Sequence, residues 1–377
     1  MLAESKLCLN MIVKNETKTL PNLFKSLHKI IDYYVILDTG STDGTPELIK
    51  EEMNNYNIKG EVHLGEWVNF GYCRNEALKL AVGKADYILI IDADEELYYK
   101  DADFFKQLTH NCYNLIKRYG GVEYYIPAIL NIKENNKLGW EGKGVVHNYF
   151  STKNRLTDIY DVPVDNTHII SHIHGGAKSH GVSHEEKYLR DAKLLEEELK
   201  KNPDDRRSQF YLGQSYRDAG FVDKAIENYQ KRADMGGWIE EVYYSKLRIG
   251  RLMLQKGKSF NKFCPILLEA YQLIPTRVEA IHTLVNYCRI QKWYHLGYLF
   301  GRIPVNIRNT NCKLFIEKYS YDYGLLDDYS ICAYWAGDYE EANKCCNIIL
   351  KEGKIPESQI ERIKKNLEFG LEKVNKI

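Results

Sequence analysis

The feature that most constrains the fold is a change of sequence pattern near residue 180. Before it, short apolar runs alternate with segments of helical periodicity; after it, amphipathic helical segments follow one another to the end. Short continuous apolar runs separated by helices are typical of a mostly parallel sheet covered by helices. The pattern therefore predicts an α/β, Rossmann-like domain over residues 1–180 and an all-α domain over residues 181–377.

The first half is expected to contain four strands and three helices. The predicted strands are 7–13, 33–41, 61–67 and 85–97, and the predicted helices are 20–31, 46–53 and 74–81. Ligands of such sheets bind at the carboxyl ends of the strands. Polar residues follow several of these strands, so the binding site is expected at this edge.

The second half contains imperfect helical repeats after a first amphipathic helix at 184–203. One unit has the spacing of a tetratricopeptide helix–turn–helix, with Leu212, Gly213, Tyr216, Gly220, Ala225 and Tyr229 at the pattern positions. Looser copies cover 249–275 and 329–356, and a capping helix is expected at 357–377. The segments predict a tetratricopeptide-like α-solenoid of three or four helix pairs, with most of its tyrosines in the core.

Composition excludes several classes of protein. Lys and Arg number 52 and Asp and Glu number 52, so zero net charge removes the bulk attraction to nucleic acids and anionic membranes. No apolar run reaches the ~18–20 residues of a membrane span, and the start does not resemble a signal peptide. Nine cysteines without a CxxC pair indicate free, mostly buried thiols. A soluble, cytoplasmic protein is expected.

The strongest chemical signal is the acidic segment IIDADEEL at 90–97. We expect a strand to deliver Asp92 and Asp94 to its end, where residues i and i+2 share a face and can converge on one ligand. Two close carboxylates repel unless a cation lies between them, and oxygen ligands with a phosphate suit Mg²⁺ or Mn²⁺. The alternative is an acidic helix N-terminus.

Three other segments place polar residues at the same expected edge. MIVKNE (11–16) and VILDTGSTDGT (35–45) end strands, and FGYCRNEAL (70–78) puts a guanidinium and an amide at a helix start, where they suit phosphate or base recognition. Each alone is a common turn or helix start. Their order and spacing together are more specific.

These motifs in this order resemble family-two glycosyltransferases of the GT-A fold, most closely the subgroup whose catalytic domain precedes tetratricopeptide-like repeats. The resemblance covers residues 5 to about 235, because WEGKGVVHN (140–148), ISHIHGG (170–176) and YLGQSYRDAG (211–220) also fit. It implies a metal-dependent hexosyltransferase that uses a UDP-sugar donor, with glucose or N-acetylglucosamine favoured. The acceptor would be a protein, peptide or glycan.

The resemblance also implies roles for individual residues. The nucleotide sugar would be held by strand-end and helix-start residues: Val13, Asn15, Glu16, Asp38, Gly40, Ser41, Arg74 and Asn75. Asp92-Ala93-Asp94 would be the DxD element, with Asp92 near the ribose or metal and Asp94 a direct ligand of Mn²⁺ or Mg²⁺. The metal would neutralise charge on the leaving nucleotide. Aromatic candidates for stacking on sugar are Trp67, Trp140 and Tyr125.

The sequence departs from the subgroup at the residue expected to act as the general base. Family members generally invert the anomeric centre, which requires a carboxylate to deprotonate the acceptor. Where the subgroup usually has His-Glu, this chain has His147 followed by Asn148, and a neutral amide cannot serve as a base. Glu141 is the substitute candidate, and weaker ones are Asp158, Asp161 and Asp165. A thiol or amide acceptor would relax the requirement.

Two histidines, His172 and His174, lie two apart on one predicted strand face and would complete the metal site. His174 is favoured because it precedes Gly175 and Gly176, where backbone can approach phosphate. The alternative is that these histidines are structural. The spacing is not that of a zinc site.

Two further function classes are weighed against the enzyme. One is a repeat-based interaction protein with a degenerate glycosyltransferase domain, a reading that Asn148 permits. The other, nucleotidyl transfer, usually opens with a Gly/Arg-rich loop that this sequence lacks. In the enzyme, the helical half would recognise the acceptor or form a homodimer.

Overall fold

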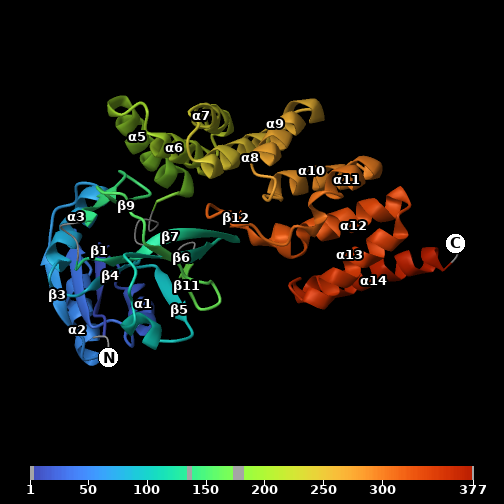
Figure 1. Ribbon diagram of the computed structural model, residues 1–377. Helices are drawn as coiled ribbons and strands as arrows, with labels where there is room; N and C mark the ends of the chain where they lie inside the picture. Colours follow the sequence, from blue (N-terminus) through green and yellow to red (C-terminus); the bar gives the residue numbers. More distant parts are fainter. Residues whose placement is uncertain (1–3, 134–137, 173–181, 376–377) are drawn as a thin grey trace. The chain divides into compact units, whose positions relative to one another are not determined.

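A computed structural model describes residues 4–133, 138–172 and 182–375 (Figure 1). The chain divides into two compact units, Met1–Gly220 and Phe221–Ile377. The predicted fold class, an α/β part followed by a mainly helical part, is confirmed: the last strand of the first unit ends at Ser171, and helices follow from His184 with one two-residue strand, Ile316–Glu317, among them. The predicted boundary near residue 180 lies where the strands stop, whereas the first compact unit extends through the next two helices.

The first unit contains a mixed sheet with the strand order β3-β2-β1-β4-β7-β6-β11-β5. The four strands from β3 to β4 are parallel, and β7 runs antiparallel to both β4 and β6. The strands are β1 (Leu7–Val13), β2 (Tyr33–Asp38), β3 (Lys59–Leu64), β4 (Tyr87–Ile90), β5 (Glu95–Tyr99), β6 (Cys112–Tyr119), β7 (Val122–Asn131), β10 (Ile159–Asp161), which pairs with β6, and β11 (Thr167–Ser171).

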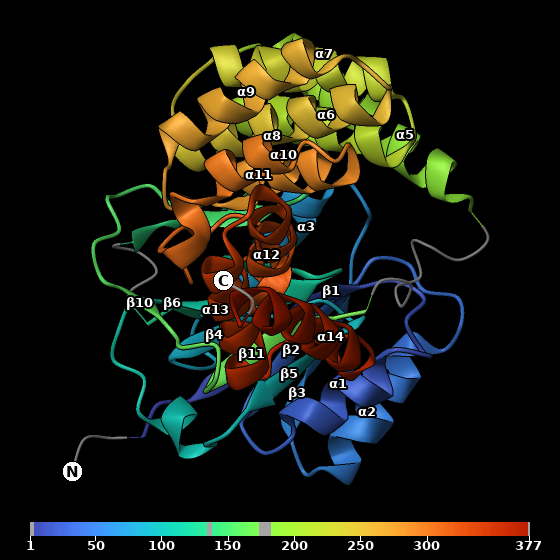
Figure 2. The same cartoon turned by 90° about the vertical axis from the view of Figure 1, so that its right-hand side faces the viewer.

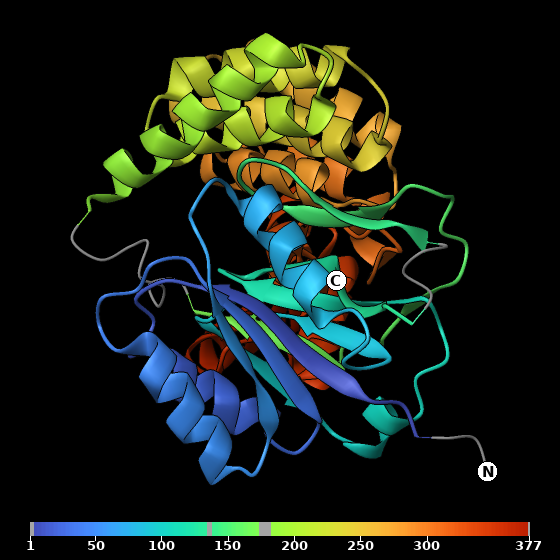
Figure 3. The same ribbon diagram turned by 90° about the vertical axis from the view of Figure 1, so that its left-hand side faces the viewer.

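Helices cover both faces of the parallel strands, as Figure 3 shows. They are α1 (Leu20–Leu27), α2 (Thr45–Asn55) and α3 (Phe70–Ala81), and a short 3-10 turn, η1, spans Asp103–Lys106. Side chains of a strand alternate between faces. Leu7 and Leu9 of β1 therefore pack in the cluster that holds α1 and α2, and Cys8 packs with Leu78 of α3 on the other face.

The predicted fourth strand is wrong in its length. β4 ends at Ile90, the chain turns through Asp92–Asp94, and β5 begins at Glu95 to pair antiparallel with β11. Asp92 and Asp94 thus share a turn rather than a strand face. The apolar run that suggested one long strand ends at Ile91, where the pairing partner changes from β1 to β11.

A separate hairpin and two helices complete the first unit. β8 (Trp140–Lys143) pairs with β9 (Tyr149–Thr152), and α5 (His184–Lys201) and α6 (Arg206–Asp218) follow. Ser183 and Glu186 form a capping box at the start of α5, and the Asp205 side chain caps α6. These caps explain why both helices begin where polar residues stand in the sequence.

The second unit is helical, and successive helices pack side by side (Figure 2). Its elements are α7 (Val222–Asp234), α8 (Ile239–Gln255), α9 (Phe260–Leu273), α10 (Glu279–Ile290), α11 (Tyr294–Gly301), η3 (Pro304–Asn306), β12 (Ile316–Glu317), η4 (Ser320–Gly324), α12 (Leu325–Ala336), α13 (Tyr339–Glu352) and α14 (Glu357–Val374). Gly250 of α8 allows a close crossing with α9, since a Cβ there would lie 2.6 Å from the Leu267 side chain.

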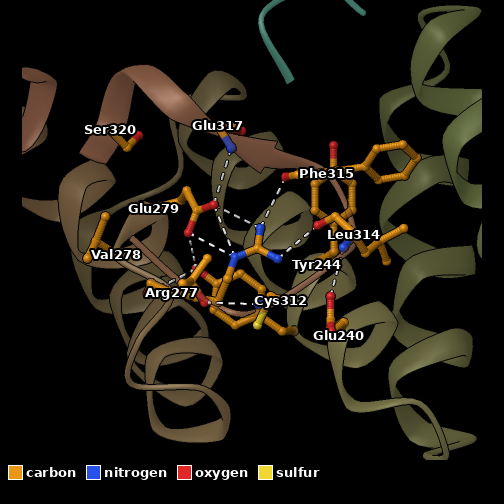
Figure 4. Close-up of polar contacts among 12 residues, drawn as sticks. Glu240, Tyr244, Arg277, Val278, Glu279, Cys312, Leu314, Phe315, Glu317 and Ser320 are labelled. Atoms are coloured by element: carbon orange, nitrogen blue, oxygen red, sulfur yellow. Dashed lines mark hydrogen bonds and ion pairs between the residues drawn. The ribbon is translucent and has the colours of Figure 1, made fainter. Parts of the chain in front are cut away.

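Buried charges hold one segment of this unit in place, as Figure 4 shows. Arg277 is fully buried; its Nε donates to both carboxylate oxygens of Glu279 at 3.0 Å. Its two terminal nitrogens donate to the carbonyl oxygens of Leu314 and Phe315 at 2.9 and 3.1 Å. The guanidinium therefore ties the start of α10 to residues 314–315 and leaves no buried charge uncompensated there.

Across the described residues, no helix is both long enough and apolar enough to span a bilayer.

Candidate functional site

The loops after β1 and β2 form one interlocked wall at the carboxyl edge of the sheet. Asp38 ends β2, and its Oδ1 accepts the backbone N–H groups of Gly40 and Ser41, both at 2.8 Å. Asn15, with φ of +57°, follows β1; its N–H donates to the Ser41 hydroxyl at 2.8 Å and its Oδ1 accepts the Thr42 N–H at 2.7 Å. The structure thus brings together the predicted residues of both motifs.

Two other predicted residues support this wall. The Val13 carbonyl accepts the Thr39 N–H at 2.9 Å, which joins the ends of β1 and β2. The Glu16 N–H donates to the Thr45 hydroxyl at 2.9 Å, and its carboxylate accepts the Thr19 hydroxyl at 2.8 Å. Glu16 therefore interacts with the starts of both α1 and α2.

Buried polar atoms without partners lie at this edge. The Oδ2 atom of Asp38, a residue only 1% exposed, has no hydrogen-bond partner among the described residues. Neither do Nε and Nη1 of Arg74, a residue only 3% exposed. Leaving such groups unsatisfied costs about 1–3 kcal/mol each, and more for charged ones. An acceptor and two donors are therefore ready for a ligand that carries both a donor and an anionic group.

The DxD turn lies against two cations. Asp92 pairs with Arg74 of α3 and approaches Lys117 of β6, whose Nζ lies 3.7 Å from its Oδ2. Lys117 also pairs with the buried Glu95, whose Oε2 accepts the Asp92 N–H at 2.9 Å. Desolvation opposes ionisation of Asp92, but the two cations outweigh it and hold its pKa below the usual value. Asp92 thus remains an anion.

Asp94 differs because no ion pair among the described residues involves its carboxylate. Desolvation and the charge of Asp92 raise the pKa of Asp94 above its ordinary value. A cation bound beside it would relieve both effects. The donor chemistry fits a divalent metal, since Mg²⁺ is commonly held by one or two carboxylates together with substrate phosphates and water.

The histidines give no further metal ligand within the described residues. His172 follows β11, donates its backbone N–H to the Asp94 carbonyl at 3.3 Å, and places Nε2 2.9 Å from the Glu96 carboxylate. His174 lies outside the described residues. In the parts of the chain that the structure covers, no group of three or more His, Cys, Asp or Glu side chains converges as a metal site.

Sequence reasoning did not identify Lys117. It stands in LIKRY, where a lysine follows an apolar run within a strand, and only 15% of its side chain is exposed. Nearby carboxylates outweigh desolvation and raise its pKa well above the ordinary lysine value, so it stays charged. The available signal was a charged residue in an otherwise buried strand. It did not identify the site, because the partners of Lys117, Asp92 and Glu95, come from a distant segment.

Helix α3 connects the DxD turn to the hairpin β8–β9. Arg74 pairs with Asp92, while the next residue, Asn75, exchanges two hydrogen bonds with the backbone of Gly142. Its Nδ2 donates to the Gly142 carbonyl at 2.9 Å and its Oδ1 accepts the Gly142 N–H at 2.7 Å. Asn75 therefore positions the hairpin with its whole amide group. Gly71 allows the close approach, because a Cβ there would lie 3.1 Å from the Gly144 carbonyl oxygen.

A cavity of about 620 Å³ opens between the start of α3, the hairpin and helices α5 and α6. Glu141, the predicted base, lines it; its side chain is 44% exposed and lies 3.7 Å from the Lys143 ammonium. Val146 and Tyr149, on either side of His147 in the sequence, also line the cavity.

His147 is held rigidly at the hairpin end. Its φ is +49°, and its ring stacks on Tyr211 of α6 with centroids 4.1 Å apart. The Arg207 guanidinium donates to the His147 carbonyl at 3.2 Å and lies between the rings of Tyr149 and Tyr211, at 4.4 and 4.8 Å from their centroids. This stack fixes the hairpin against α6.

The other predicted bases and one predicted sugar-stacking residue lie away from this site. Asp158 forms a hydrogen bond with His110 at 2.5 Å, next to Cys112, the first residue of β6. Cys112 precedes Lys117 by five residues, which is roughly 17 Å along the strand. Asp161 accepts the Asn114 amide at 2.7 Å in the same region, and Asp165 lies in the turn before β11. Trp140 is buried and donates Nε1–H to the Asn131 carbonyl at 2.8 Å, so it packs in the core and offers no face to a sugar.

Comparisons with known proteins point to the same region. The family described as Glycosyl transferase family 2 matches residues 8–158. Glycosyltransferase SunS of Bacillus phage SPbeta, like its prophage-derived counterpart in Bacillus subtilis, is 27% identical over 248 residues, which cover 61% of this chain and 55% of SunS. A TPR repeat-containing protein of Synechococcus elongatus is 37% identical over 97 residues, 26% of this chain and 22% of that protein.

The chain thus spans about half the length of SunS and about a fifth of the length of the Synechococcus protein. Among solved structures, S. aureus TarS 1-349 in complex with UDP-GlcNAc is 16% identical, covers 71% of this chain and 91% of that chain, and has a TM-score of 0.38, which is too low to add to the argument. Residues 8–158 of the chain thus match the model of glycosyl transferase family 2, and helices follow the α/β part.

Proposed function

We propose that the chain is a glycosyltransferase that takes a hexose from a UDP-sugar and transfers it to a protein, peptide or glycan acceptor. The observation that carries this proposal is the set of buried atoms on Asp38 and Arg74, at the carboxyl edge of the sheet, that have no hydrogen-bond partner among the described residues. A nucleoside diphosphate sugar supplies both complements, because its base and ribose donate hydrogen bonds and its diphosphate is an anion. The glycosyltransferase name of the SunS relatives supports the same chemistry.

In this proposal, the wall formed by Asn15, Asp38 and Ser41 holds the nucleoside, and Arg74 holds the diphosphate. Asp94 would hold Mn²⁺ or Mg²⁺, which when bound supplies a Lewis acid that neutralises charge on the leaving nucleotide. Arg74 and Lys117 keep Asp92 ionised and fixed in the turn. The protein thereby presents a preorganised, charged surface to the donor and needs little rearrangement to bind it.

The acceptor would be deprotonated from the side of the hairpin. Glu141 is the proposed base, because it is the carboxylate of β8 that lines the cavity, and the nearest cation among the described residues, Lys143, lies 3.7 Å away, beyond hydrogen-bond distance. Attack opposite the leaving diphosphate would invert the anomeric centre. Asn75 keeps Glu141 at a constant distance from the donor by holding the neighbouring Gly142.

The test is hydrolysis of UDP-glucose and UDP-N-acetylglucosamine by the purified chain with Mn²⁺. Asp94→Ala should abolish release of UDP, whereas Asp103→Ala, which removes an exposed carboxylate on η1, should retain it. If neither donor is bound or hydrolysed and Asp94→Ala has no effect, the enzyme proposal is wrong and a repeat-based interaction protein with a degenerate domain is the better account.

A further inference from the structure

We propose that the cavity beside α3 binds a segment of an acceptor polypeptide through a basic side chain, with apolar side chains of the same segment on the adjoining surface. This inference rests on the proposed glycosyl transfer and names its acceptor. The cavity belongs entirely to the first compact unit, and its walls come from the start of α3, the hairpin β8–β9 and helices α5 and α6.

The cavity and the donor region are joined by neighbouring residues of one helix. Arg74 of α3 pairs with Asp92 in the DxD turn, and Asn75 binds Gly142 in the cavity wall. A Cβ added to Gly142 would lie 3.3 Å from the Arg74 Cβ, so the hairpin packs directly on the residue that pairs with Asp92 of the DxD turn. A group bound beside Glu141 is therefore close to the sugar of a bound donor.

The walls of the cavity are formed before any ligand binds. Asn75 fixes β8 with two hydrogen bonds, and Arg207 fixes β9 and α6 by lying between Tyr149 and Tyr211. Because these groups are held by the fold, a ligand would pay little to order them. The cavity of about 620 Å³ is large enough for one long side chain and its flanking backbone.

The charges that line the cavity favour a cation. Three carboxylates line it against two cations, and the cations are already engaged: Arg207 lies between two rings and Lys143 lies beside Glu141. Asp205 caps α6. Within the described residues, Glu198 accepts one hydrogen bond, from the Asn202 amide at 2.5 Å, which leaves its other carboxylate oxygen for a ligand. With Glu141 beside Lys143 and Asp205 in the cap, Glu198 is the lining carboxylate that can receive a lysine or arginine side chain.

The surface next to the cavity favours a polypeptide over a glycan. Four large apolar side chains are exposed between the end of β3 and the first turn of α3: Leu64, Trp67, Val68 and Tyr72, with exposed fractions of 81%, 44%, 55% and 48%. Asn69 and Tyr72 of this segment also line the cavity. Leu64 and Val68 are aliphatic and complement apolar amino acids, whereas the aromatic faces of Trp67 and Tyr72 suit a peptide or a sugar. The aliphatic side chains therefore distinguish the two classes of acceptor. Exposed apolar patches of this kind mark interaction surfaces.

The experiment uses a library of random twelve-residue peptides displayed on phage and selected on the full chain. Glu198→Lys is the test variant and Glu197→Lys is the matched control. The control makes the same charge change one residue earlier on α5, at a position that does not line the cavity. We expect enriched peptides to combine Lys or Arg with apolar residues. By fluorescence anisotropy, they should bind Glu198→Lys at least about tenfold more weakly than wild type and bind Glu197→Lys normally.

Three outcomes would overturn the proposal: no enrichment, equal binding of the enriched peptides by Glu198→Lys and Glu197→Lys, or binding of chitotetraose at this cavity in place of peptides. The thermal shift produced by UDP-sugar is measured on the same three proteins and should not change. Peptide binding without any nucleotide-sugar binding would refute glycosyl transfer and with it the acceptor role. Nucleotide-sugar binding without peptide binding would refute the acceptor proposal alone.

Discussion

Arg74→Met should weaken the binding of UDP far more than it changes the fold. Arg74 is 3% exposed, pairs with Asp92 through one nitrogen, and has two further nitrogens, Nε and Nη1, that find no partner in the described parts of the chain. If both donate to the diphosphate, methionine removes two hydrogen bonds to a charged group. Such bonds contribute about 1.5–3 kcal/mol each, so even the lower value gives roughly 3 kcal/mol, or a loss of about 100-fold in affinity. Methionine preserves the apolar part of the side chain.

The assay is isothermal titration calorimetry of UDP with Mn²⁺ present. Lys79→Met is the control, since Lys79 lies on the same helix with its side chain 70% exposed and paired to Glu76. Asp92 keeps Lys117 as a partner in the variant, and circular dichroism checks that the fold is retained. A dissociation constant within threefold of wild type, in a folded Arg74→Met protein, would show that these nitrogens do not contact the donor.

The remaining predictions concern the base, the helical unit and pH. Glu141→Gln should lower transfer by about 10²–10⁴-fold in product assays while UDP-sugar binding is retained; turnover at the wild-type rate would remove Glu141 as the base. Arg277→Met should lower the free energy of unfolding, measured in urea, by about 3–5 kcal/mol because it leaves the fully buried Glu279 carboxylate without its cation. Adding Glu279→Gln should recover much of this loss. A loss under about 1 kcal/mol contradicts the account. Lys84, with Tyr33 and His63, lowers the pKa of Glu61 to about 2. The wild type should therefore have a larger free energy of unfolding than Glu61→Gln above the ordinary Glu pKa of about 4.3, and the difference should shrink as pH falls toward 2. A difference that does not vary with pH would refute this.

The elements that the sequence predicted best are those in which local signals and tertiary packing agree. The strand 7–13 and the start of the helix at residue 184 match β1 and α5, because an apolar run and a capping box are both local. The DxD segment was mispredicted as a strand. Its end depends on β11, which pairs with Glu95 from more than 70 residues away and is invisible to a local pattern.

The site shows the same division. The motifs that contain Asn15, Asp38 and Arg74 were found from the sequence, since polar residues after apolar strands are unusual and their order is informative. Lys117 was missed because a lysine in a strand becomes informative only when Asp92 and Glu95 are known to face it. Asn75 was expected to contact the nucleotide, but its amide is engaged by Gly142, a partner that only the packing of the hairpin reveals.

The central claim, that the carboxyl edge of β1, β2 and β4 binds a sugar nucleotide, is tested most directly by a thermal-shift screen of nucleotide sugars with and without Mn²⁺. A ligand present at 100 times its dissociation constant stabilises the folded state by about 2.7 kcal/mol. We expect a UDP-sugar with Mn²⁺ to raise the melting temperature of the wild type and not that of Asp94→Ala. If no nucleotide sugar raises the melting temperature of the wild type, with or without Mn²⁺, the edge is not a donor site and the proposed function is wrong.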